Sequence, residues 1–216
     1  MSDRKLEEIE ISIPKDVLAS LPAENYNGKT IVVSSEKNVR KALEHLRKAD
    51  IIGFDTETKP NFKKGQQNKV ALIQLATEEK CFLFRISKSG LLQEIIDFLE
   101  DEKITKVGLS VHDDFLGLSR IKPVVPQGFI DIQSFVKQYR IIDNSLTRIY
   151  GILFGKRIAK AQQLSNWETS KLSEAQKRYA SLDAQACIKI YRHLKENRFD
   201  PLASPYILPD EKEEDK

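Results

Sequence analysis

Apolar and polar residues follow two periods along the chain. Short apolar runs predict strands over 30–34, 51–55, 70–76, 80–86, 104–109 and 129–132. Apolar residues at helical spacing predict helices over 36–49, 91–99, 145–155 and 173–197, with another beginning at Asp113. The polar turn 77–79 makes 70–86 a hairpin beside the first long strand. A hairpin followed by strands alternating with helices predicts an α/β, three-layer domain with a mixed central β-sheet flanked by helices.

This pattern divides the chain into three segments. Residues 1–29, punctuated by Pro14, Pro22 and Gly28, are expected to form an N-terminal extension packed on the domain. Residues 30–200 form the single domain. Residues 201–216 are expected to be a disordered acidic tail, because the last seven residues hold five acids and two lysines.

Composition narrows the class of protein without naming a function. The chain has 216 residues and 31% charged residues, with no apolar stretch near the ~20 residues that span a bilayer. Because the N-terminus has no apolar signal-peptide core, a cytoplasmic location is expected. Cys81 and Cys187 give no disulfide or zinc pattern, so buried thiols are expected. Without the last seven residues, 33 basic and 27 acidic residues remain, which is compatible with a polyanionic partner.

Two carboxylates end the predicted strand in the stretch IIGFDTE. Asp55 and Glu57 are two residues apart, so on an extended backbone they share one face. Like charges on one face repel each other, and the stretch 51–57 has no lysine or arginine to compensate them. A divalent cation is the natural partner. The alternative is that one acid caps a helix while the other is simply solvated.

Two further acids belong to other elements, one at the passage from a strand into a helix and one on the last helix. Asp114 follows the strand 104–109, and its neighbour Asp113 makes the choice between the two acids less certain. Asp183 and Tyr179 are four apart on the last helix and therefore share a face at the border of its apolar stripe. One alternative is that Asp113 and Asp114 only interact favourably with the helix dipole. Another is that Tyr179 only forms a hydrogen bond with Asp183 that stabilises the helix.

Taken together, these motifs resemble one enzyme family. Asp55-x-Glu57, then Lys106-(x)7-Asp114, then Tyr179-x-x-x-Asp183 are similar to the DEDDy branch of the DEDD 3′–5′ exonucleases, which have an RNase H-like fold. Ribonuclease D, the Werner-type exonuclease domain and the proofreading domain of family A DNA polymerases belong to that branch. The resemblance spans about residues 30–197, and it includes a second strand over 70–75 and an S-N-W segment at 165–167. Residues 108–113 differ from the sequence that some members of this family have at the same place.

The resemblance implies an activity and roles for the site residues. It implies metal-dependent removal of nucleoside 5′-monophosphates from nucleic-acid 3′ ends. Asp55, Glu57 and Asp183 would hold one of two Mg²⁺ or Mn²⁺ ions, and Asp55 would bridge to the second, with Asp114 nearby. Tyr179 would orient the attacking water, because a phenol with a pKa near ~10 is a poor base at neutral pH.

The substrate is expected to be nucleic acid with single-stranded or recessed 3′ ends, DNA slightly ahead of RNA. The loop 58–69 supplies candidate phosphate contacts and one candidate base contact. These substrate-binding candidates are Lys59, Phe62, Lys63, Lys64 and Lys69. A solvated loop is the alternative. Trp167 is expected to be a packing anchor rather than a platform for a base.

Two other functions compete with this interpretation. FDTET and the pair Asp113-Asp114 resemble motifs of haloacid dehalogenase-like phosphatases, but that chemistry needs an aspartate where this chain has Glu57. It also leaves Tyr179 and Asp183 without a role. The second alternative is a nucleic-acid-binding module of the same fold that is catalytically weak or inactive. Such a relative usually lacks one of the acids, and this chain has all four.

Overall fold

The chain folds around a mixed β-sheet in the order β1-β4-β3-β2-β5-β6. The structure is a computed structural model that describes residues 5–60 and 68–209. Strand β3 runs antiparallel to its neighbours β2 and β4, whereas the pairs β1–β4, β2–β5 and β5–β6 are parallel. The strands are β1 (Lys29–Val33), β2 (Ile51–Thr58), β3 (Val70–Ala76), β4 (Lys80–Phe84), β5 (Thr105–Gly108) and β6 (Phe129–Asp131). The predicted hairpin and mixed sheet are confirmed.

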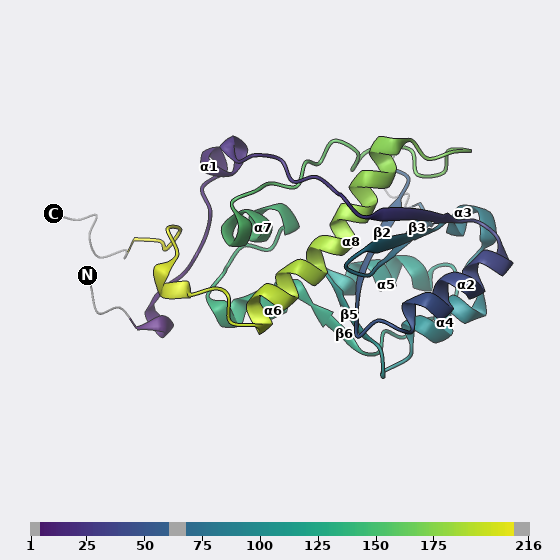
Figure 1. Cartoon of the computed structure of the whole chain (residues 1–216), viewed down its shortest axis with the longest axis horizontal. Coiled ribbons are helices and arrows are strands. Elements are labelled where there is room, and N and C mark those ends of the chain that lie inside the picture. The colour runs from purple at the N-terminus through teal and green to yellow at the C-terminus, as the bar shows by residue number, and fades with distance from the viewer. Residues whose placement is uncertain (1–4, 61–67, 210–216) are drawn as a thin grey trace.

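Helices cover both faces of the sheet and produce three layers (Figure 1). The α-helices are α1 (Lys15–Ser20), α2 (Glu36–Leu46), α3 (Ile86–Ser89), α4 (Gln93–Leu99), α5 (Val111–Ser119), α6 (Ile132–Phe135), α7 (Leu146–Phe154) and α8 (Glu174–Lys195). Three 3-10 helices are η1 (Leu6–Glu8), η2 (Val136–Tyr139) and η3 (Pro201–Ala203). Over the described part of the chain, none of the helices is long and apolar enough to cross a membrane.

Two apolar clusters hold the three layers together. One lies between the sheet and helices α2, α4 and α5. The other lies between the opposite face and helices α6, α7 and α8. Helix α8 crosses this second face obliquely, which is visible in Figure 1. Its start is fixed by a capping box, in which the Ser173 hydroxyl accepts from the Gln176 N–H and the Gln176 side chain accepts from the Ser173 N–H.

Helix α8 approaches strand β2 closely because residue 53 has no side chain. A Cβ atom added at Gly53 would lie 2.0 Å from the carbonyl oxygen of Ala184. Backbone atoms cannot yield as a flexible side chain can, so a larger residue here would push the helix away from the strand. Asp55 lies two residues beyond Gly53 and Asp183 lies one residue before Ala184. The glycine therefore allows acids from two distant segments to meet.

Two of the boundaries that differ from the sequence prediction lie beside the predicted acids. Strand β2 continues through Thr58 rather than ending at Asp55, because its pairing with β3 extends further. In that pairing, Asp55 lies opposite Gln74 and Glu57 lies opposite Leu72. Helix α5 begins at Val111 rather than Asp113. The carboxylate of Asp131 accepts the Val111 N–H at 2.8 Å and holds this earlier start.

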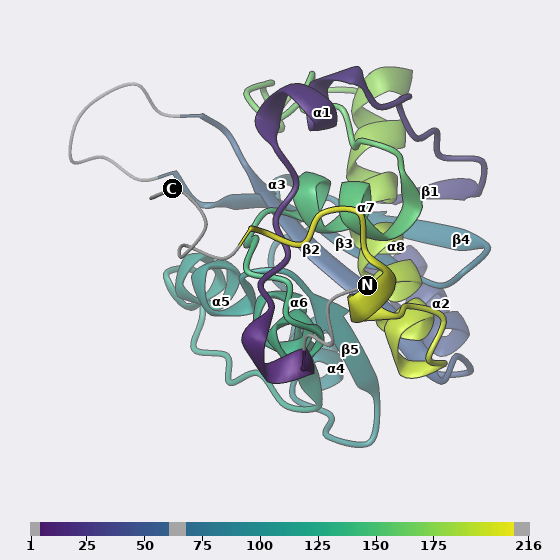
Figure 2. The same ribbon diagram turned by 90° about the vertical axis from the view of Figure 1, so that its left-hand side faces the viewer.

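The two ends of the described chain lie side by side against the α7 side of the domain (Figure 2). Ile9, Ile11 and Ile13 are buried in the same cluster as α8. Ile11 forms β-bridges with both Ile141 and Ile207. Residues 201–209 are therefore packed, and their assignment to a disordered tail was wrong; the buried N-terminal segment provides a partner that local sequence does not reveal. The remainder of the predicted tail, 210–216, lies outside the described residues.

Candidate active site

Three carboxylates from two distant elements meet above strand β2. One oxygen from each of Asp55, Glu57 and Asp183 lies within 4.8 Å of the others. Glu57 and Asp183 are 9% and 6% exposed, and Asp55 is partly exposed. Asp55 and Glu57 share a face of β2, as their spacing predicts, and α8 brings Asp183 over that face. The structure thus assembles three of the four acids that the sequence singled out.

The fourth acid, Asp114, lies beside this group on α5. It accepts a hydrogen bond from the Thr56 hydroxyl, and Thr56 stands between the two acids of β2. Asp113 instead is exposed and accepts a hydrogen bond from the Ser110 hydroxyl at 2.9 Å. Ser110 has a left-handed backbone, with φ 60°, at the turn from β5 into α5. This geometry favours Asp114 over Asp113 as the fourth acid.

Tyr179 points from α8 toward the same acids. Tyr179 and Asp183, one helical turn further along, line the same cavity, and burial together with the charge of Asp183 raises the pKa of the phenol. The Trp167 ring is fully buried and packs against the Tyr179 ring, with centroids 6.1 Å apart. The segment that contains Trp167 is tied to α8 by Gln176, whose amide donates to the Ser165 hydroxyl at 3.0 Å and the Asn166 carbonyl at 3.1 Å. Trp167 is a packing residue, as predicted, and it fixes the tyrosine.

Burial and mutual repulsion disfavour the charged forms of all four acids. Burial raises the pKa of Asp55 to about 7. Burial, followed by the charges of Asp55 and Asp183, raises the pKa of Glu57. The pKa values of Asp114 and Asp183 are raised by burial and by the charge of Asp55. Burial and nearby carboxylates also raise the pKa of Tyr179, so its phenol keeps its proton.

This donor set fits a hard divalent cation. Only oxygen ligands are gathered, and Mg²⁺ and Mn²⁺ prefer such ligands whereas zinc favours nitrogen and sulfur. Lys160 is exposed and its charge lowers the pKa of Asp183, but this effect is smaller than that of burial. Several partly buried carboxylates so close together require positive charge to ionise at neutral pH. Asp55, Glu57 and Asp183 are the residues that would hold the ion, with Asp114 adjacent.

The raised pKa values predict a pH-dependent stability of the metal-free protein. Because the folded state binds protons more tightly than the unfolded chain, these acids stabilise it below pH ~4. That contribution is lost as the pH rises through about 7, the folded pKa of Asp55. Mn²⁺ at about 100 times its Kd should raise Tm at pH 8 by about 5–10 °C, and by less at pH 5 where protons compete.

Thermal melts in EDTA and in Mn²⁺ at the two pH values measure this prediction. Asp183→Asn is the control, and its Tm should respond little to Mn²⁺. An equal response of both proteins would show that the ion binds elsewhere.

Two cavities open on either side of the acids. One, of about 340 Å³, is lined by Asp55, Tyr179 and Asp183 together with Lys160 and Gln163. The other, of about 500 Å³, is lined by Glu57 and Asp114 together with residues 58–60 and Arg120. Gln163 lines both cavities, and its neighbour Leu164 is 72% exposed. The acids therefore lie at the junction of two open cavities that a polymer end can enter.

The predicted substrate-binding residues are only partly placed. Lys59 is exposed, lines the larger of these two cavities and forms an ion pair with Glu168 at 3.5 Å. Lys69 is exposed beside the start of β3. Phe62, Lys63 and Lys64 lie outside the described residues.

Several residues that line the cavities belong to no sequence motif. Lys160 and Gln163 precede the S-N-W segment, and Arg120 follows α5. The basic composition before the S-N-W segment was the available signal for Lys160. Lys106, by contrast, begins the second motif but lies away from the acids. It is fully buried and donates to the carbonyls of Asp101 at 2.7 Å and Phe98 at 3.3 Å.

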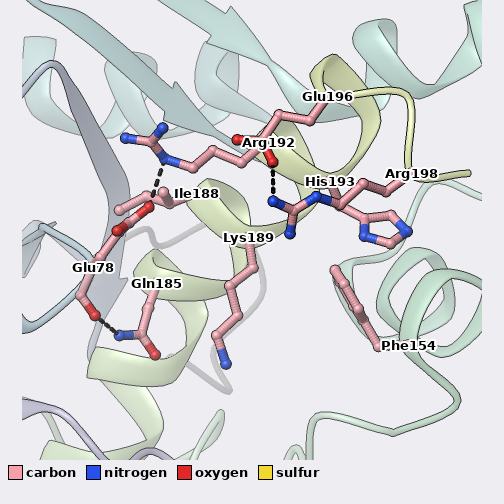
Figure 3. Close-up of a pocket in the computed structure, with 9 residues that line it drawn as sticks. All are labelled: Glu78, Phe154, Gln185, Ile188, Lys189, Arg192, His193, Glu196 and Arg198. Carbon is pink, nitrogen blue, oxygen red and sulfur yellow. Dashed lines mark hydrogen bonds and ion pairs between the residues drawn. The ribbon is translucent and has the colours of Figure 1, made fainter.

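A cavity of about 560 Å³ elsewhere on α8 is lined by none of the four acids (Figure 3). Its cations are already compensated. Arg192 Nε lies 2.6 Å from the Glu78 carboxylate, Arg198 pairs with Glu196 at 2.5 Å, and Lys189 lies 3.8 Å from Glu24. The carboxylates of this cavity, Glu78 and Glu196, are therefore paired with arginines, and it holds none of the clustered acids expected of the active site.

Comparisons with known proteins agree with this geometry. The family described as 3′-5′ exonuclease matches residues 30–197. The mouse bifunctional 3′-5′ exonuclease/ATP-dependent helicase WRN is 34% identical over 155 residues, which cover 69% of this chain and 11% of that protein. The chain thus spans about a tenth of the length of this relative.

Solved structures show the same fold. The Nibbler EXO domain of Aedes aegypti superposes with a TM-score of 0.73 at 23% identity, over 83% of this chain and 96% of that domain. RNase D of Escherichia coli, an exoribonuclease involved in structured RNA processing, superposes with a TM-score of 0.70 at 21% identity. That alignment covers 78% of this chain and 44% of RNase D.

Proposed function

The chain belongs to the 3′–5′ exonuclease family, and from this premise we propose that it removes nucleoside 5′-monophosphates from nucleic-acid 3′ ends with two divalent cations. The observation that supports the proposal most strongly is the meeting of Asp55, Glu57 and Asp183 within 4.8 Å, with Asp114 beside them. Two dications about 3.5–4 Å apart need several carboxylates to coexist.

Each residue of the site has a role that its position supports. Asp55, Glu57 and Asp183 would hold one ion, and Asp55 and Asp114 would hold the second. When bound, the two ions supply a hydroxide nucleophile and stabilise the leaving 3′ oxygen. Tyr179 keeps its proton because its pKa is raised, so it orients the attacking water through its O–H and does not act as the base.

The scissile phosphate lies over the acids in this proposal, at the junction of the two cavities. Upstream phosphates then meet Lys59 and Arg120 on one side and Lys160 on the other. Lys69 and the loop residues Phe62, Lys63 and Lys64 are further contacts proposed from sequence. The contacts of these lysines and of Arg120 with phosphates govern the affinity for nucleic acid rather than the chemical step, because they act through counterion release.

The preferred polymer is proposed to be DNA, slightly ahead of RNA. The support is that the relatives include the DNA polymerase I of Aquifex aeolicus, which is 25% identical over 166 residues that cover 76% of this chain and 27% of that protein. A digestion panel of 5′-labelled single-stranded DNA, duplex DNA with a recessed 3′ end and RNA, each with Mg²⁺ or Mn²⁺, tests this. Faster shortening of either DNA is expected. Faster shortening of RNA would contradict the order proposed.

A catalytically weak or inactive binding module of the same fold is the competing function. It predicts that the protein retains labelled DNA on a filter without producing any metal-dependent ladder. Against it stands the complete set of acids, since a module that only binds gains nothing from gathering repelling carboxylates in one place.

A further inference from the structure

Strand β3 contains a buried amide for which the fold gives no explanation. Gln74 is 0% exposed, and neither its Nε2 nor its Oε1 has a hydrogen-bond partner among the described residues. The buried glutamines of α8 differ, because the amides of Gln176 and Gln185 both donate to defined acceptors. A buried amide without a hydrogen-bond partner destabilises the fold. Because the rest of β3 is apolar, a leucine at this position would avoid the cost.

The strand register shows which group the amide faces. Gln74 lies directly opposite Asp55 of β2 and directly opposite Leu83 of β4. Residues directly opposite on antiparallel strands share a face, with Cβ atoms about 4.5–5.5 Å apart. Leu83 has no polar group, so the Asp55 carboxylate is the polar side chain beside this amide. On the same face, the hydroxyls of Thr30 and Ser181 already bond to each other at 2.8 Å.

Alternation along β3 places Gln74 on the side of the sheet that α8 covers. Leu72 and Ala76, two residues to either side, belong to the cluster beneath α8. Ile73 and Leu75 belong to the opposite cluster. Asp183 on α8 and Asp55 on β2 meet over this same face. The unpaired amide is therefore on the side of the sheet on which the acids meet.

We propose that Gln74 is a positioning residue for Asp55: once an ion is bound, its amide, unpaired in this structure, donates to the Asp55 carboxylate oxygen that does not face the ion. The inference rests on the proposed function. The Asp55 carboxylate has about four acceptor sites, which leaves room for a donor beside the ion. A donor behind a metal ligand orients it and favours its ionised form. Such a residue touches neither substrate nor ion, so it acts only through Asp55.

Gln74→Met tests the proposal, because methionine keeps the shape of glutamine and removes its hydrogen bonds. The matched control is Leu83→Met, which changes the other cross-strand neighbour on the same face. Calorimetric titration of each protein with Mn²⁺, without nucleic acid, should give a Kd about 10- to 100-fold weaker for Gln74→Met only. The metal-free Tm of Gln74→Met should match or exceed that of the wild type. Equal Mn²⁺ affinity of the two variants would overturn the proposal.

Kinetics separate positioning from a general packing role. Gln74→Met should lower kcat at limiting Mn²⁺, recover at excess Mn²⁺ and leave KM for the oligonucleotide within about twofold of the wild type. A kcat loss that excess Mn²⁺ does not reduce would contradict the inference. If the wild-type protein neither binds Mn²⁺ nor cleaves nucleic acid, the proposed function fails. If the wild type binds Mn²⁺ and cleaves, but Gln74→Met behaves like Leu83→Met, only this inference fails.

A measurement on the wild type covers the case in which Gln74→Met does not fold. The side-chain ¹⁵NH₂ resonances of Gln74 in labelled protein, followed during a Mg²⁺ titration, report directly on its hydrogen bond. A shift that saturates with Mg²⁺ binding supports the proposal. Resonances that stay unchanged while the site fills contradict it.

Discussion

Asp55→Ala and Glu57→Gln are each expected to slow cleavage of a 5′-labelled oligonucleotide by about 1,000-fold or more. Each change removes an oxygen from the cluster in which three acids lie within 4.8 Å. Loss of one ligand weakens the binding of the ion and misplaces the nucleophile that the ion supplies. A 1,000-fold change in rate corresponds to about 4 kcal/mol in the activation barrier. Nucleic-acid binding in EDTA should survive or improve, because repulsion within the site is relieved.

The neighbouring pair on α5 provides the matched control. Asp114 accepts from Thr56 beside the cluster, whereas Asp113 is exposed and bonds to Ser110. Asp114→Asn should therefore lose activity comparably, and Asp113→Asn should stay within about threefold of the wild type. The reverse order would mean that the fourth acid was assigned to the wrong residue. Full activity in Asp55→Ala would remove the basis for the two-ion mechanism.

Tyr179→Phe is expected to lower kcat by about ten- to a thousand-fold with little change in Mn²⁺ affinity or Tm. The phenol is held between the Trp167 ring and Asp183, so the phenylalanine ring keeps the packing and loses only the O–H. If that O–H orients the attacking water, its loss affects the chemical step and not binding.

Single-turnover rates across a Mn²⁺ titration distinguish the possible roles of Tyr179. Asp183→Asn is the comparison, because it should weaken metal binding itself and recover partly at high Mn²⁺. A Tyr179→Phe protein as fast as the wild type would make the tyrosine a packing residue. Rescue of Tyr179→Phe by excess Mn²⁺ would instead assign it to the metal site.

The acids and Tyr179 could be predicted from sequence because their signals are local. The two-residue period of a strand is enough to place Asp55 and Glu57 on one face, and the period of a helix is enough to place Tyr179 and Asp183 on one face. Gly53 and the apolar runs likewise indicate strand β2 without knowledge of its neighbours. Those features predicted the mixed sheet and its main helices, and the structure brings Asp55, Glu57 and Asp183 together.

Features that depend on pairing between distant segments could not be predicted. The extension of β2 through Thr58 depends on its register with β3, and the same register places Gln74 beside Asp55. Lys106 was recognised by its spacing from Asp114. That spacing does not reveal that its amine donates hydrogen bonds to two backbone carbonyls near the end of α4. Packing of residues 201–209 depends on the bridge between Ile11 and Ile207, which are far apart in sequence.

The central claim is that the gathered carboxylates hydrolyse nucleic acid from its 3′ end with divalent metal. The most direct measurement digests one oligonucleotide labelled at the 5′ end, in Mn²⁺ or EDTA, and identifies the released product by mass. A ladder that shortens stepwise from the 3′ end, with nucleoside 5′-monophosphates released in Mn²⁺ and none in EDTA, is predicted. Cleavage that persists in EDTA, or an undigested oligonucleotide under every metal condition, would contradict the claim.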